Sequence, residues 1–217
     1  MGVGIHEVEK VIAELKLIVE EEEVPEQILN IVVHLDEVIE NYSDLFRQSE
    51  KKEEDILKLL KGAIFNVEYR MKAHDIFLQN DFLNRKSLII PCSKRLLLGA
   101  VMNILDNSIY WLERKYSKLR TKEGILFEKK ILIDFNVDNE GYVNLIIADN
   151  GFGFGIPTQQ ITKPFITDKP NGMGLGLHIV KEIMKVQGGQ LYFPEYGEYE
   201  LTDDFQDGAV VVLKLKK

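Results

Sequence analysis

Two runs of alternating apolar residues, 131–137 and 143–147, restrict the fold more than any other part of the chain. Alternate side chains of a strand point to the same face of a sheet, so each run predicts a strand with a buried face. The residues between them, 138–141, read Asp-Asn-Glu-Gly and are typical of a tight turn. The two runs are therefore expected to pair as an antiparallel hairpin.

The elements around this hairpin predict an α+β fold. Amphipathic helices are expected over residues 56–72, 94–120 and 174–187, and further strands over 76–82, 87–90, 191–193 and 209–215. This order favours a two-layer α/β sandwich, with a mixed, mostly antiparallel sheet and helices on one face.

The first 50 residues have a different pattern, that of a helical hairpin. Apolar residues repeat at spacings of three and four along a first helix, at Ile5, Val8, Ile12, Leu15 and Val19. A second helix is expected over 25–47, with Ile28, Ile31, Leu35, Val38, Tyr42 and Leu45 on one stripe. Residues 48–55 are expected to be a polar linker.

Two short amphipathic helices cannot bury their apolar seams alone. We therefore expect the hairpin to pair with a second copy as a four-helix bundle, which makes the protein a homodimer. The alternative is that both helices pack on the domain that follows them. In either case residues 1–50 and 51–217 are expected to form separate domains.

Composition argues against two classes of partner. With 27 basic and 35 acidic residues, and a net charge of −8, the chain has no broad basic surface for nucleic acid. No apolar run approaches the roughly 20 residues of a membrane span, so no membrane contact is expected within this chain. The single cysteine, Cys92, is expected to be buried and suits a reducing cytoplasm, where we expect the protein to be located.

The long helix over 94–120 carries two amides, Asn103 and Asn107, one turn apart on a face shared with Tyr110 and Arg114. Buried amides need partners, and amide oxygens suit a hard cation such as Mg²⁺. The alternative is a pair of structural amides that are satisfied within the protein.

Two glycine-rich stretches follow, and each is a common pattern by itself. Residues 149–155, Asp-Asn-Gly-Phe-Gly-Phe-Gly, start where a strand ends, so Asp149 is placed to accept a hydrogen bond from a purine amino group. Glycines there let the backbone pass close to a flat ring. Residues 171–177, Asn-Gly-Met-Gly-Leu-Gly-Leu, open a helix, whose free amides form an anion site for phosphates. The alternative for both stretches is a simple glycine-rich turn.

Together, in this order, the three motifs resemble the nucleotide site of the gyrase, histidine-kinase and MutL superfamily, over residues 55–217 and most densely over 95–189. The resemblance implies ATP and Mg²⁺ as cofactors, with Asn107 as the metal ligand and Asp149 on the adenine amino group. It also implies an F box at Pro164-Phe165, inside a lid over residues 155–173. The remaining nucleotide contacts implied by the resemblance are Gly151, Gly153, Phe165, Thr167, Lys169, Gly172, Gly174, Leu175, Gly176 and Leu177.

Position 103 separates the branches of this superfamily. Members that hydrolyse ATP, and the anti-sigma serine kinases, typically have a glutamate there as general base, but Asn103 cannot take a proton. In this respect the chain resembles histidine kinases, where the imidazole itself is the nucleophile. Those kinases usually have Lys or Arg three residues after the metal asparagine, whereas this chain has Tyr110, with Arg114 and Lys115 as possible substitutes.

Four histidines are candidates for the phosphoacceptor. His74 and His178 lie in the α/β domain, where His74 is interpreted as a loop histidine and His178 as structural. His6, followed by Glu7, resembles the start of the family's H box, and a carboxylate there can hold one ring N–H and activate the other nitrogen. His34 is the alternative acceptor, and neither being used is the third possibility.

The resulting hypothesis is an ATP-dependent histidine autokinase of a two-component system. It would phosphorylate itself on His6, with Asn103 and Glu7 in the catalytic machinery, and pass the phosphoryl group to an aspartate on a response-regulator receiver domain. Residues 1–50 would be the dimerisation and phosphoacceptor hairpin and 51–217 the catalytic ATP-binding domain. The alternatives are a nucleotide-switched ATPase, and a degenerate kinase that acts as an ATP-binding interaction module.

Overall fold

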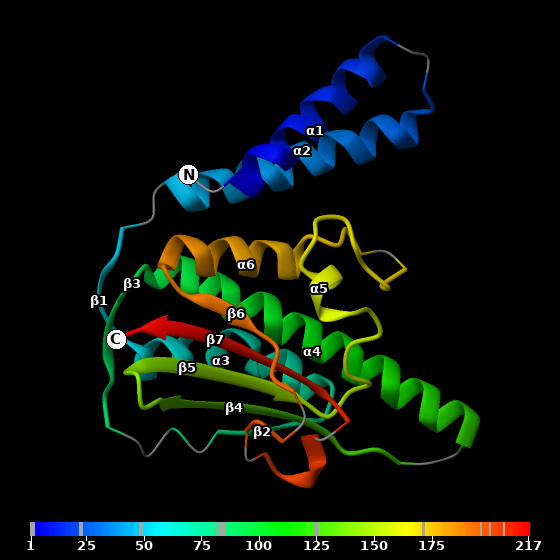
Figure 1. The fold of residues 1–217 in the computed structure, drawn as a ribbon. Coiled ribbons are helices and arrows are strands. Elements are labelled where there is room, and N and C mark those ends of the chain that lie inside the picture. Colours follow the sequence, from blue (N-terminus) through cyan, green and yellow to red (C-terminus); the bar gives the residue numbers. More distant parts are fainter. Residues whose placement is uncertain are drawn as a thin grey trace. The chain divides into compact units, whose positions relative to one another are not determined.

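The computed structural model describes residues 3–21, 24–47, 50–80, 82, 86–123, 126–170, 172–195, 197–199, 201–205 and 207–217. The chain divides into two compact units, residues 1–50 and 51–217 (Figure 1). Each unit is described by itself.

The first unit is a hairpin of two helices, α1 (Val3–Glu21) and α2 (Glu26–Arg47), which run side by side in opposite directions (Figure 1). Pro25 immediately precedes α2, where its fixed φ suits the start of a helix, and its carbonyl accepts the hydrogen bond of Ile28 N at 2.8 Å. An ion pair of 2.5 Å between Lys16 Nζ and Asp36 Oδ2 joins the two helices.

The seam predicted for α1 is confirmed at Val8, Ile12 and Val19, which are buried. Within one hairpin, the stripe predicted for α2 is not buried at its first two positions. Ile28 and Ile31 are 44% and 60% exposed, whereas Val32 and Ile39 are buried. A single neighbouring helix can bury only one side of an apolar stripe, so α2 keeps exposed apolar residues on its other side.

The second unit is built on a five-stranded sheet of order β2-β4-β5-β7-β6. Strand β2 (Ile76–Gln79) is parallel to β4 (Lys129–Val137), and all other pairs are antiparallel. The predicted hairpin is formed by β4 and β5 (Tyr142–Asp149) and is followed in the sheet by β7 (Ala209–Lys216) and β6 (Gln190–Tyr192). The α+β class and the mixed, mostly antiparallel sheet are confirmed.

Three helices cover one face of this sheet (Figure 1): α3 (Ile56–Ala73), α4 (Lys94–Glu123) and α6 (Gly176–Gln187). Strand alternation turns Ile131, Ile133 and Leu145 toward them, and all three are fully buried. Each such side chain contributes about 1.5–3 kcal/mol by leaving water. The same alternation turns the last residue of β5, Asp149, toward the helices, because it pairs with Ile131.

The opposite face of the sheet is partly covered by the acidic segment before β7. Phe205, in the short 3₁₀ helix η2 (Asp203–Phe205), is buried against Leu132, Ile146 and Val212. No helix or strand was predicted for this segment, because one apolar residue among acidic ones has no period.

The expectation of a linker over 48–55 is wrong for its second half. Residues Lys52–Asp55 form strand β1, which pairs antiparallel with β3 (Ile89–Cys92). Backbone hydrogen bonds to β3 create this strand, so its polar side chains show no apolar alternation. Cys92 is buried as expected, and burial raises the pKa of its thiol to about 11. Among the residues described, no helix has the length and apolar character needed to cross a membrane.

Candidate functional site

The first motif is organised around the carboxyl group of Asp149, at the end of β5. Ser108 Oγ, on α4, donates to Asp149 Oδ2 at 2.7 Å, and the Gly151 amide donates to Asp149 Oδ1 at 2.9 Å. The carboxyl group is buried, and this burial raises its pKa, while the hydrogen bonds from Ser108 and Gly151 act in the opposite direction. Each oxygen keeps a further lone pair, so the group can still accept from a ligand N–H.

Asp149→Asn is expected to change how stability depends on pH. A carboxyl group with a raised pKa holds its proton more tightly in the folded than in the unfolded protein, so wild-type stability falls as pH rises from the ordinary value of 3.8 through the raised pKa. The asparagine does not titrate. The difference in unfolding free energy, variant minus wild type, should therefore grow with pH and then level off.

Urea unfolding at pH values from about 4 to 8, followed by fluorescence of the single tryptophan, Trp111, measures this difference. Trp111 lies on α4 close to Gly151, so it reports on this domain. A difference that stays constant across the range would show that the Asp149 carboxyl has an ordinary pKa.

Several positions around Asp149 need glycine, either because other atoms lie too close for a side chain or because of the backbone conformation. A Cβ on Gly151 would lie 2.7 Å from Asp149 Oδ1, and one on Gly208 would lie 1.6 Å from the Asp149 carbonyl oxygen. Gly153 has a φ of 72°, a left-handed conformation that favours glycine. Gly208 was not predicted as a site residue, because nothing near it in sequence indicates that β5 passes beside it.

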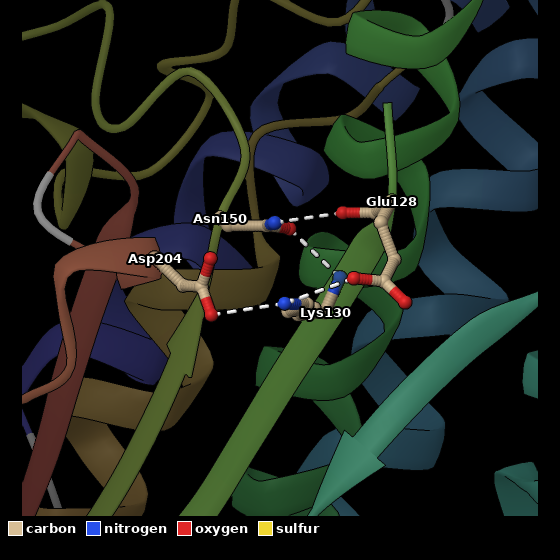
Figure 2. A network of polar contacts seen from close by, with 4 residues as sticks. All are labelled: Glu128, Lys130, Asn150 and Asp204. Carbon is tan, nitrogen blue, oxygen red and sulfur yellow. Dashed lines mark hydrogen bonds and ion pairs between the residues drawn. The ribbon is translucent and has the colours of Figure 1, made fainter. Parts of the chain in front are cut away.

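Asn150, the residue after Asp149, ties the end of β5 to the beginning of β4 (Figure 2). Its Nδ2 donates to the Glu128 carbonyl and its Oδ1 accepts from Lys130 N, both at 2.8 Å. The Lys130 ammonium group forms ion pairs of 2.9 Å with Glu128 and Asp204. This network holds the backbone on both sides of Asp149 in place.

Lys115, proposed above as a possible phosphate-side cation, lies at the first motif instead. Its Nζ donates to the carbonyl oxygens of Asn150 at 2.7 Å and Gly151 at 2.9 Å, and it lies over the rings of Phe127 and Phe152. Burial lowers the pKa of this lysine. The ammonium group of Lys115 therefore holds the glycine loop in place through these two carbonyl groups.

The two asparagines of α4, Asn103 and Asn107, lie near the second glycine motif at the start of α6. A Cβ on Gly176 would lie 3.3 Å from Asn103 Oδ1 and 3.8 Å from Asn107 Nδ2. Asn103 Nδ2 donates to the Gly99 carbonyl at 2.9 Å, which fixes the orientation of that amide. Leu175 is buried and anchors the helix, and Leu177 is half-buried. The free amides of the first turn of α6 thus lie beside both asparagines.

The glycines of the second motif have different surroundings. Gly174 has a φ of 68°, and a Cβ there would lie 2.6 Å from the backbone of Phe165 and Ile166. The Phe165 amide donates to the Gly174 carbonyl at 3.1 Å, so this glycine closes the lid against the F box. The predicted helix start at 174 is wrong by two residues for this reason, because a left-handed residue cannot open an α-helix.

The lid contains a short helix, α5 (Thr158–Ile161), and a turn that presents Lys169. Lys169 Nζ donates to Asn107 Oδ1 at 2.5 Å and lies 4.5 Å from the centre of the Tyr110 ring. The amide oxygen that was predicted to bind Mg²⁺ therefore points at a cation. A divalent ion fits this oxygen, since Mg²⁺ binds through few protein oxygens and completes its shell with water and phosphate.

The structure describes less of the residues predicted around the phosphoacceptor. His6, Glu7 and His34 lie on α1 and α2, but their side chains are outside the described part of the structure, as is the whole of Asn171. His178 is buried, and its Nδ1 lies 3.1 Å from the Thr162 carbonyl oxygen.

Comparisons with known proteins agree with this arrangement. A family model described as histidine kinase-, DNA gyrase B- and HSP90-like ATPase matches residues 93–217. Sporulation kinase D of Bacillus subtilis is 26% identical over 133 residues, which is 61% of this chain and 22% of that protein. Sensor protein TdiS of Thauera aromatica is 22% identical over 174 residues, 77% of this chain and 30% of TdiS. The chain thus spans about a quarter of the length of these curated relatives.

Solved structures share the fold. The mycobacterial sensor histidine kinase MprB matches with a TM-score of 0.55 and 21% identity, covering 76% of this chain and 96% of that chain. The Acinetobacter baumannii histidine kinase AdeS matches with a TM-score of 0.56 and 15% identity, covering 95% of this chain and 93% of that chain.

Proposed function

The chain belongs to the family of histidine kinase-, DNA gyrase B- and HSP90-like ATPases, as the catalytic core of a histidine kinase, and we propose that it is an autokinase that phosphorylates its own His6 from Mg-ATP. The phosphoryl group would then pass to an aspartate on a response-regulator receiver domain.

One observation carries this proposal. Two consecutive residues of α4 serve the two ends of one site, because Ser108 holds the buried acceptor Asp149 while Asn107 contacts the lid cation Lys169 beside Gly176. Asp149 is suited to the amino group of adenine, and the amides at the start of α6 are suited to phosphates. A single helix would thereby position both ends of the nucleotide.

The chemistry favours transfer to an imidazole over hydrolysis. Asn103 stands where a general base would be needed for water, and its amide is held by Gly99 and cannot accept a proton. A neutral imidazole is already a nucleophile, so it needs orientation more than it needs a base. A carboxylate next to it, for which we propose Glu7, would hold the ring in the reactive tautomer.

Asn107 would hold Mg²⁺, which supplies neutralisation of the phosphate charge when it is bound. The other groups position the substrate: Asp149 orients the base, and the glycine amides of 172–176 approach the phosphates. Thr167 and Lys169 of the lid would approach the terminal phosphate. Catalysis would then rest mainly on positioning and charge neutralisation.

The helical unit is proposed to form the homodimer. Large apolar side chains of α1 and α2 remain exposed, among them Leu17 at 58%, Ile18 at 55% and Ile31 at 60%. A second copy of the hairpin would cover such residues in a four-helix bundle. The same unit would present His6 to the receiver domain.

Incubation with γ-labelled ATP and Mg²⁺ tests the choice of acceptor. We expect acid-labile label on the wild-type protein, its loss in His6→Gln, and its retention in His34→Gln, because His6 is followed by a carboxylate and His34 is not. Label that persists in His6→Gln but not in His34→Gln would assign the role to His34. Steady release of phosphate that is unaffected by both substitutions would instead indicate a nucleotide-switched ATPase.

A further inference from the structure

The lid lysine, Lys169, and the helix residue Tyr110 form a contact that the proposed function does not use. The histidine kinases that this chain resembles usually carry Lys or Arg three residues after the metal asparagine, on the helix itself. This chain has Tyr110 there, and the ammonium group of Lys169 lies 4.5 Å from the centre of its ring. The distance is within the range of a favourable cation–π interaction.

The backbone of the lid presents this lysine. The Lys169 amide donates to Thr167 Oγ1 at 3.1 Å, and the Gly172 amide donates to the Lys169 carbonyl at 3.0 Å. A Cβ on Gly172 would lie 2.8 Å from Lys169 Cβ, so the turn closes tightly only because residue 172 is glycine. The turn therefore fixes where the Lys169 side chain begins, and its ammonium group contacts α4.

The ammonium group of Lys169 has an amide oxygen and two carboxylates as neighbours. Asn107 Oδ1 accepts from Lys169 Nζ at 2.5 Å. Burial lowers the pKa of Lys169, and the nearby carboxylates of Asp106 and Asp168 act in the opposite direction. Asp106 is itself held by Arg70 at 2.5 Å, so this charge is fixed to α3.

We propose that Tyr110 is a positioning residue whose ring docks Lys169 at the phosphate side of the nucleotide site. A lid lysine thereby replaces the cation that related kinases carry on the helix. The inference rests on the proposed function, since it assigns this lysine to the terminal phosphate of ATP. It implies that closure of the lid and recognition of that phosphate depend on the same aromatic ring.

The first test uses the protein without nucleotide. Hydrogen exchange of residues 164–176 should be faster in Tyr110→Leu and in Lys169→Met, and unchanged in Tyr110→Phe, because phenylalanine keeps the ring face. Tyr69→Leu is the matched control, since Tyr69 is 84% exposed on α3. Equal exchange in Tyr110→Leu and wild type would overturn the docking of Lys169. Lys169→Met gives the same readout if Tyr110→Leu does not fold.

The second test measures affinity for Mg-ATP and Mg-ADP by calorimetry. Loss of a cation–π contact predicts about 3- to 10-fold weaker ATP binding by Tyr110→Leu, a smaller change for ADP, and near wild-type binding by Tyr110→Phe and Tyr69→Leu. The double variant with Lys169→Met should bind no more weakly than Lys169→Met alone. Fully additive losses would show that the two residues act independently.

Rescue is the most specific outcome. Tyr110→Arg restores the helix cation, so it should recover the ATP affinity lost in Lys169→Met. Failure of this rescue, or a loss of ATP affinity in Arg114→Ala but not in Lys169→Met, would overturn the proposal. If the wild-type chain binds no ATP, the proposed function fails, but the exchange experiment still tests the contact between ring and ammonium group.

Discussion

Asn107→Ala is expected to reduce autophosphorylation at least about 100-fold, since even partners of metal ligands cost 10–100-fold when they are removed. The substitution removes the amide oxygen that points at a cation in the structure, where Lys169 Nζ lies 2.5 Å away. Under the proposed function, Mg²⁺ would lose a protein ligand and the phosphates would lose the ion that neutralises them.

The fold should survive this change, because Asn107 is only half-buried and alanine is a good helix former. Labelling from γ-labelled ATP over a range of Mg²⁺ concentrations measures the effect, and the thermal midpoint measures stability. Asn66→Ala is the control, as an exposed asparagine on α3. An unchanged rate and an unchanged Mg²⁺ dependence in Asn107→Ala would remove Asn107 from the role of metal ligand.

Gly208→Ala is expected to lower the free energy of unfolding by at least about 3 kcal/mol and to abolish nucleotide binding. The new methyl group would lie 1.6 Å from the carbonyl oxygen of Asp149, far inside contact distance, so one of the two backbone segments must move. The segment ending at Asp149 carries the carboxyl group proposed to bind adenine. Movement there disturbs the sheet and the site together.

Gly62→Ala should have the opposite effect. Gly62 lies inside α3, and a Cβ there would meet nothing within 4 Å. Alanine in an open helical position stabilises by roughly 0.5–1 kcal/mol. Urea unfolding followed by Trp111 fluorescence compares the two variants, and calorimetry with Mg-ADP measures binding. Similar stability changes in both would mean that β5 and residue 208 do not approach as closely as the structure shows.

Much of the fold followed from local patterns. The alternation over 131–147 predicted β4 and β5, and the apolar period of residues 94–120 predicted α4. Both patterns are strong because each element buries one regular face. Strand β1 and the cap formed by Phe205 were missed, because backbone pairing and a single buried ring leave no periodic signal.

The same difference between local patterns and long-range contacts applies to the candidate site. The three motifs and their order could be read from local patterns, since glycines and amides at a strand end and a helix start are recognisable around Asn107, Asp149 and Gly176. Which distant groups contact these motifs depends on the packing of the folded chain: Ser108 contacts Asp149, Gly208 lies against the same strand, and Lys169 lies over Tyr110. These contacts join residues that are far apart in the sequence, and the pattern of residues along the chain carries no information about them.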